Sequence, residues 1–199
     1  MPLFAEALKL RADGAIAAAS GDVRAALAAA GEINALLAKI TPRDPGDEIN
    51  KGASVFFANE LKAQCELLLG DFAAVEKSAK SALAGKELWI VDPTVDARVK
   101  GSLSTLMALA QARQGRIAEA KATIEPVVKL QRDLAARNRG DQPQRIEMAS
   151  ALYVQSLTDP GRRSALLREA RALLDGLPAE VKALNSTRLW ADQLRAAAG

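Results

Sequence analysis

Three carboxylates lie close together in one stretch of the sequence and could do metal chemistry. Asp44, Asp47 and Glu48 could supply oxygen ligands to a hard cation such as Ca²⁺. The alternating ligand spacing and the distal glutamate of a calcium-binding loop are missing, however. We therefore predict no metal site and expect these residues to cap a helix starting near Ala53, whose positive end they would favour.

The single cysteine and the two tryptophans each allow two interpretations. Cys65 could be a redox switch, but it falls on the apolar stripe of an expected helix and has no cysteine beside it. That setting favours a buried small side chain. Trp89 and Trp190 could stack on a ligand, or they could seal the ends of a helical array. We favour packing for all three, with Trp190 sealing the array from the last helix.

The composition excludes several kinds of enzyme. The 199 residues contain no histidine and one cysteine, which excludes histidine-based catalysis, zinc sites built on histidine, and a disulfide within the chain. The sequence also lacks a GxxxxGK phosphate loop, a GxSxG nucleophile elbow and an HExxH motif. We predict no catalytic residue, no cofactor and no enzymatic activity. An enzyme that works with carboxylates alone is the remaining alternative in this class.

The net charge of +3 is unevenly distributed along the chain. Residues 101–199 hold 15 Lys and Arg against 10 Asp and Glu. Two clusters of basic residues stand out, namely Arg132, Arg137, Arg139 and Arg145, and then Arg162, Arg163, Arg168 and Arg171. A phosphate-binding surface is one interpretation. Acidic residues interleave with the arginines and aromatics are scarce, so we favour solvated helix faces and keep nucleic acid as a minor alternative.

Glycines at regular intervals indicate the elements that position these residues. Gly21, Gly70, Gly115 and Gly161 are separated by 49, 45 and 46 residues, and each can end one helix and begin another. Apolar residues follow at steps of three and four, which places them on one helical stripe. After the second glycine these are Phe72, Val75, Ala79, Ala82 and Leu83, and after the third they are Ile117, Ala120, Ile124, Val127 and Val128.

This pattern predicts an all-α fold in a single domain of residues 1–199. About four antiparallel helix pairs are expected at about residues 3–40, 53–85, 95–137 and 143–176, with a short capping helix within 179–198. Linkers containing proline and glycine separate the pairs, and we interpret residues 88–91 as an apolar linker rather than a strand. Pro126 lies inside the sixth expected helix and is predicted to kink it.

The helix pairs resemble tetratricopeptide repeats. That family has a small residue midway along the first helix, glycine at the turn, and small residues down the second helix. The second pair matches with Ala63, Gly70, Phe72, Ala79 and Ala82, the third with Ala108, Gly115, Ile117 and Ala120, and the first with Gly14, Gly21, Val23, Ala26 and Ala30. The fourth pair departs at Val154 and Arg163, and all the intervals are longer than the family's standard repeat. The resemblance implies a divergent, long-helix version of a right-handed α-solenoid.

In the resembled family, the first helices of the pairs line a concave groove that accepts an extended peptide or a partner's helix. The resemblance therefore implies a groove lined by Arg11, Phe57, Glu60, Gln64, Thr105, Leu109, Met148 and Gln155, with Leu8 and Ser102 beside them. Several of these residues, especially Leu8, Leu109 and Met148, could instead pack against the second helices. The basic and amide residues of the family's carboxylate clamp are mostly absent, which disfavours a chaperone-tail receptor.

These observations favour a module or scaffold that binds a protein or peptide partner. The alternative is a regulatory or sensor segment of a larger bacterial-type signalling protein, such as a cyclase, a kinase or a transcription regulator. No sufficiently long apolar window exists for a membrane span, and the N-terminus lacks the features of a secretory signal. We expect a cytoplasmic protein, or a periplasmic one if an upstream signal was removed. A homo-oligomer is left open.

Overall fold

The computed structural model describes residues 2–85, 93–137 and 140–197. All regular elements within these residues are helices, which confirms the all-α class. Consecutive helices pack in pairs, as a helical repeat would. The chain divides into two compact units, Met1–Asp96 (unit 1) and Ala97–Gly199 (unit 2). No helix in the described part of the chain is both long and apolar enough to cross a membrane.

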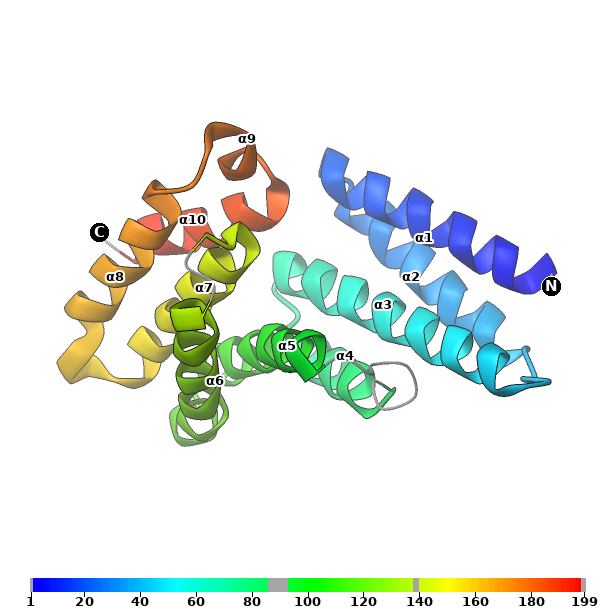
Figure 1. Ribbon diagram of the computed structural model, residues 1–199, viewed down its shortest axis with the longest axis horizontal. Helices are drawn as coiled ribbons and strands as arrows, with labels where there is room; N and C mark the ends of the chain where they lie inside the picture. The colour runs from blue at the N-terminus through cyan, green and yellow to red at the C-terminus, as the bar shows by residue number, and fades with distance from the viewer. Residues whose placement is uncertain (1, 86–92, 138–139, 198–199) are drawn as a thin grey trace. The chain divides into compact units, whose positions relative to one another are not determined.

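Unit 1 is built from two helix pairs. Helix α1 (Pro2–Ser20) pairs with α2 (Val23–Ala38), and α3 (Pro45–Leu69) pairs with α4 (Phe72–Gly85). Helix α2 also packs along α3, and α1 contacts α3 directly (Figure 1). The predicted stripes of the second helices are buried here, because Ala26, Ala30, Ile33, Val75, Ala79 and Ala82 are all at most 2% exposed.

Unit 2 contains α6 (Ile117–Arg137), α7 (Gln142–Thr158), the short 3₁₀ helix η2 (Pro160–Arg162) and α8 (Arg163–Asp175). It also contains α9 (Ala179–Lys182), α10 (Asn185–Ala196) and most of α5 (Pro93–Arg113). Helix α7 packs against α6 and α8, and α10 contacts α7 and α8 (Figure 1). The stripe residues Ala120, Ile124, Val127 and Val128 are buried as predicted, whereas Ile117 is 41% exposed. Helix α6 continues through Pro126 to Arg137.

Three of the four predicted glycine turns have the expected backbone. Gly21, Gly70 and Gly115 have φ of 87°, 78° and 77°, a left-handed conformation that glycine adopts without a steric penalty. At Gly70 the turn closes with a bond from the Asp71 N–H to the Glu66 carbonyl at 3.0 Å, the pattern of a Schellman helix end. The fourth prediction is wrong in detail, because Gly161 lies inside η2 and has no positive φ.

Helix α3 begins earlier than predicted, at Pro45 instead of near Ala53. Asp44 is its N-cap, and the Asp44 carboxylate accepts a hydrogen bond from the Asp47 N–H at 2.8 Å. Pro45 stands in the first turn, where its missing N–H would have had no helical partner anyway. The proline that we read as part of the linker therefore opens the helix, and the capping role predicted for the carboxylates belongs to Asp44.

Helix α10, near the C-terminus, packs against α7 and α8 of unit 2. Trp190 in α10 is 8% exposed, and its ring lies 6.3 Å from the ring of Tyr153 in α7. This burial supports the packing interpretation of Trp190. Trp89 and the linker predicted at residues 88–91 lie outside the described residues.

Candidate functional site

The first helices of unit 1 share an accessible surface that contains the unit 1 residues of the predicted groove. This α1/α3 surface consists of Leu8 and Arg11 on α1 and of Phe57, Glu60, Gln64 and Leu68 on α3. Steps of three and four residues place each set on one side of its helix. Leu8 and Leu68 are 59% and 54% exposed, and Phe57, Glu60 and Gln64 are half-buried. Helices α1 and α3 are in direct contact.

A glycine allows the two helices to approach. A Cβ atom on Gly14 would lie 3.0 Å from Leu61 Cδ2 and 3.2 Å from Ala29 Cβ, so α1 packs closely on both α3 and α2 here. Gly14 is the small residue that the repeat pattern placed midway along the first helix. Its lack of a side chain brings the α1 residues of the surface within reach of those on α3.

Arg11 and Phe57 meet across this contact. The guanidinium carbon of Arg11 lies 3.6 Å from the centre of the Phe57 ring, which is the geometry of a cation–π interaction. The Phe57 ring in turn packs edge-on against Phe56, at 5.3 Å between ring centres, and Phe56 is 1% exposed. The core thus holds Phe57 in place, and Phe57 holds the cation of Arg11 at the surface.

The four predicted groove residues of unit 2 are in a different environment. Thr105, Leu109, Met148 and Gln155 are 2%, 0%, 3% and 8% exposed. The Thr105 hydroxyl donates to the Gly101 carbonyl at 2.8 Å inside α5. For Leu109 and Met148 this burial agrees with the alternative of packing against neighbouring helices. These side chains form part of the core of unit 2, and we do not include them in the candidate site.

A polar cluster that the sequence did not indicate joins three helices of unit 2. The Arg113 guanidinium donates to the Tyr153 hydroxyl at 2.8 Å and to the Gln193 side-chain oxygen at 2.7 Å, and the Tyr153 hydroxyl donates to the same oxygen at 2.9 Å. Burial raises the pKa of Tyr153, so the phenol keeps its proton. The bonds connect α5, α7 and α10. Because these residues are 40 and 80 positions apart, no local motif could have revealed them.

A second missed cluster lies between α5, α6 and α7. Arg98 faces Glu147 at 3.5 Å and Asp141 at 3.8 Å, and the Gln131 amide donates to Glu147 at 3.4 Å. Gln144 donates a short hydrogen bond to the Gln131 side-chain oxygen. Burial raises the pKa of Glu147, and the nearby Arg98 cation opposes that shift. The cluster satisfies polar groups within the unit.

The remaining chemical candidates are engaged in packing or pairing. Cys65 is buried, and desolvation raises the pKa of its thiol to about 11, so it lacks the thiolate that redox chemistry needs. Asp47 forms an ion pair with Arg43 at 3.1 Å. In the described residues, no three histidine, cysteine, aspartate or glutamate side chains are placed to hold a metal ion.

Several arginines of the two basic clusters contact other parts of unit 2. Arg132 pairs with Glu169 at 3.0 Å. Arg145 donates to the Gly176 carbonyl and Arg171 to the Leu194 carbonyl, each at 3.0 Å. These bonds orient the arginines within the unit, which fits solvated helix faces better than a surface dedicated to phosphates.

No protein-family model, curated protein or solved structure matches this chain.

Proposed function

We infer that unit 1 is a protein-binding module whose α1/α3 surface holds a partner peptide or helix. The observation that carries this proposal is the exposure of Leu8 and Leu68 on the same surface as the Arg11–Phe57 stack. Aromatic residues and arginine are enriched in protein interfaces, and exposed leucines on the same surface add apolar area that a partner can bury. The resemblance to tetratricopeptide repeats, which use their first helices in this way, also supports the proposal.

The surface also carries the means of selecting a partner. Gln64 is a half-buried polar residue on the same face of α3 as Phe57 and Leu68, so a partner that covers it must supply a matching polar group. The close packing of α1 on α3 at Gly14 holds the two helices together before a partner arrives. A preorganised surface of this kind lowers the entropy cost of binding.

The test compares partner capture by matched variants. The double variant Leu8→Ser/Leu68→Ser removes the two exposed leucines of the α1/α3 surface. The control variant Ile16→Ser removes an apolar side chain that is 67% exposed on α1 but lies outside this surface. Proteins captured from the source cells by the wild type are identified, purified and titrated against all three forms. We expect the double variant to lose at least about tenfold in affinity and the control to stay within about twofold.

Equal binding by the double variant and the wild type would contradict the proposal. Thermal unfolding of each form shows whether the fold is intact, and the exposed leucines predict little change in midpoint. Phe57→Ala is a further test. It removes the ring that holds Arg11, so it should lower the affinity for the same partner.

A further inference from the structure

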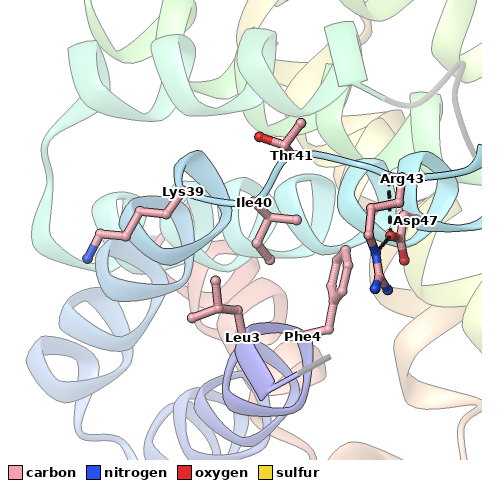
Figure 2. Close-up of a pocket in the computed structure, with 7 residues that line it drawn as sticks. All are labelled: Leu3, Phe4, Lys39, Ile40, Thr41, Arg43 and Asp47. Atoms are coloured by element: carbon pink, nitrogen blue, oxygen red, sulfur yellow. Dashed lines mark hydrogen bonds and ion pairs between the residues drawn. The ribbon is translucent and has the colours of Figure 1, made fainter.

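A pocket of about 220 Å³ opens at one end of unit 1, where α1 begins, α2 ends and α3 begins (Figure 2). One part of its lining is apolar and consists of Leu3, Phe4 and Ile40. Another part is charged and consists of Lys39, Arg43 and Asp47. The pocket is formed by residues other than those of the α1/α3 surface, so the inference drawn from it is independent of the proposed function.

The charged part of the lining contains an arginine whose position is set by a buried carboxylate. Asp47 is 6% exposed, and its Oδ2 atom accepts hydrogen bonds from the Arg43 backbone N–H at 3.2 Å and from Arg43 Nε at 3.1 Å. The bond from Arg43 lowers the pKa of Asp47, so the carboxylate is ionised at neutral pH. The Arg43 side chain is itself 62% exposed. Asp47 therefore orients a guanidinium that remains accessible.

The binding edge of Arg43 remains available. Only Nε of its guanidinium is bonded to Asp47, and neither Nη group forms a hydrogen bond with a residue in the described ranges. Two parallel N–H groups on a planar guanidinium match the two oxygens of a carboxylate. Because Asp47 already holds the group in place, less side-chain entropy is lost when an anion binds.

The charge and size of the pocket point to the same ligand class. In Figure 2 Lys39 lies at the opposite end of the lining and its amine points away from Arg43, so the oriented Arg43 guanidinium is the cation that a ligand in the pocket would meet. The apolar wall is held in place where Lys51 Nζ donates to the Ile40 carbonyl at 2.7 Å. A dry cavity of about 150 Å³ is enough to hold benzene, so a pocket of this size has room for one ring or a short branched chain.

We propose that this pocket binds a small organic carboxylate with one apolar group, whose carboxylate contacts the free Nη edge of Arg43 and whose apolar group packs on Leu3, Phe4 and Ile40. The bound form buries the apolar group and pairs the anion with an already oriented cation. Neither a neutral analogue nor a purely inorganic anion would satisfy both parts of the pocket.

The first experiment needs no variant. The ¹⁵N-labelled protein is titrated with 3-phenylpropionate and, separately, with the neutral 3-phenylpropionamide, and backbone amide shifts are followed by NMR. We expect saturable shifts concentrated at residues 3–4, 39–43 and 47, and binding of the amide that is about tenfold or more weaker. Equal affinity for the two compounds, or shifts scattered over the chain, would overturn the proposal.

The second experiment compares two cations at the same pocket. Arg43→Gln removes the guanidinium but keeps the backbone N–H that bonds Asp47, so unit 1 should remain folded. We expect this variant to bind 3-phenylpropionate about tenfold more weakly, and the Lys39→Gln control to lose less than about threefold. Equal losses in the two variants would mean that general positive charge, rather than the oriented guanidinium, attracts the anion, and the proposal would fail.

A third titration identifies the source of the ligand. A short peptide ending in phenylalanine presents the same carboxylate and ring at the end of a chain. If the peptide binds more tightly than 3-phenylpropionate, the natural ligand is the C-terminal end of a peptide chain. If the peptide binds more weakly, the natural ligand is a free small carboxylate. Both results support the proposed pocket. If neither compound binds, the proposal is wrong.

Discussion

Helices α3 and α7 are both first helices of a pair, yet their exposure differs. In α3 of unit 1, Phe57, Glu60 and Gln64 are half-buried and Leu68 is 54% exposed. In α7 of unit 2, every residue from 148 to 156 is buried. Helix α7 contacts α6, α8 and α10, and α10 adds the buried Trp190 to its surroundings. The comparison shows that the repeat pattern places a helix, while the elements that flank it determine which of its faces stay accessible.

The largest expected effect comes from loosening the helix that encloses α7. Trp190→Ala removes a ring that is 8% exposed and lies beside Tyr153, and burial on this scale predicts a loss of about 3–5 kcal/mol in the free energy of unfolding. Denaturant titration measures the loss, and amide hydrogen exchange should become faster in α7.

Leu184→Ala is the matched control, since Leu184 precedes α10 and is 53% exposed. We expect its unfolding free energy to change by less than about 0.5 kcal/mol. Unchanged exchange in α7 after Trp190→Ala would mean that α10 does not protect it.

An intermediate effect is expected where α1 approaches α3. Gly14→Ala places a Cβ atom 3.0 Å from Leu61 Cδ2, and crowding of this kind costs about 1–3 kcal/mol, which we expect to outweigh the gain of about 0.5–1 kcal/mol that alanine contributes over glycine in a helix. In contrast, a Cβ atom on Gly31 in α2 has nothing within 4 Å, so Gly31→Ala should stabilise the helix by about 0.5–1 kcal/mol. Denaturant titration of both variants checks the opposite signs, and stabilisation by Gly14→Ala would contradict the close packing.

A smaller effect is expected at the α1/α3 surface itself. Arg11→Gln removes the cation above Phe57, which predicts a loss of about 0.5–1 kcal/mol in unfolding free energy. Arg24→Gln on α2 changes another exposed arginine and should have almost no effect. If the two variants are equally stable, the stacking of Arg11 on Phe57 makes no measurable contribution in solution.

The smallest effect concerns the pH dependence of stability. The pKa of Asp47 in unit 1 is lowered, whereas the pKa of Glu147 in unit 2 is raised. The bond from Arg43 lowers the pKa of Asp47 from 3.8, so the stability it contributes is lost as pH falls through and below that value. Burial raises the pKa of Glu147 above 4.5, so it penalises the folded state at neutral pH, and that penalty disappears as pH falls to 4.5.

Matched variants separate these two contributions. Between pH 7 and pH 4, the stability of Glu147→Gln should fall relative to the wild type, because the wild type is relieved of its buried charge. Below about pH 4 the stability of Asp47→Asn should rise relative to the wild type. Denaturant titrations at each pH measure both differences, and parallel curves for the three proteins would contradict the assigned shifts.

Much of the fold could be predicted because its signals are local. Apolar spacing and left-handed glycines such as Gly70 give helix pairs close to those observed. The start of α3 was missed because Pro45 can break a helix or open one, and only the Asp44 cap distinguishes these roles. Gly161 was misread because a 3₁₀ turn also accommodates glycine.

The candidate site was only partly predictable because exposure depends on distant neighbours. The resemblance to tetratricopeptide repeats assigned Arg11 and Phe57 to one groove, and these two residues are in contact between α1 and α3. The same reasoning assigned Met148 to the groove, although α7 is enclosed by its neighbours in unit 2. The bond between Arg113 and Gln193 joins residues 80 positions apart, and no spacing rule connects them.

Hydroxyl-radical footprinting with and without a captured partner tests the central claim most directly, which is that the α1/α3 surface is open for binding while α7 is enclosed. We predict that Leu8, Phe57 and Leu68 are oxidised in the free protein and protected by the partner. Met148 should stay unoxidised in both states despite the high intrinsic reactivity of methionine, because it is 3% exposed, whereas the half-buried Met107 provides an internal reference. Protection at other surfaces that leaves Leu8 and Leu68 as reactive as before, or oxidation of Met148 as fast as Met107 in the free protein, would contradict the account.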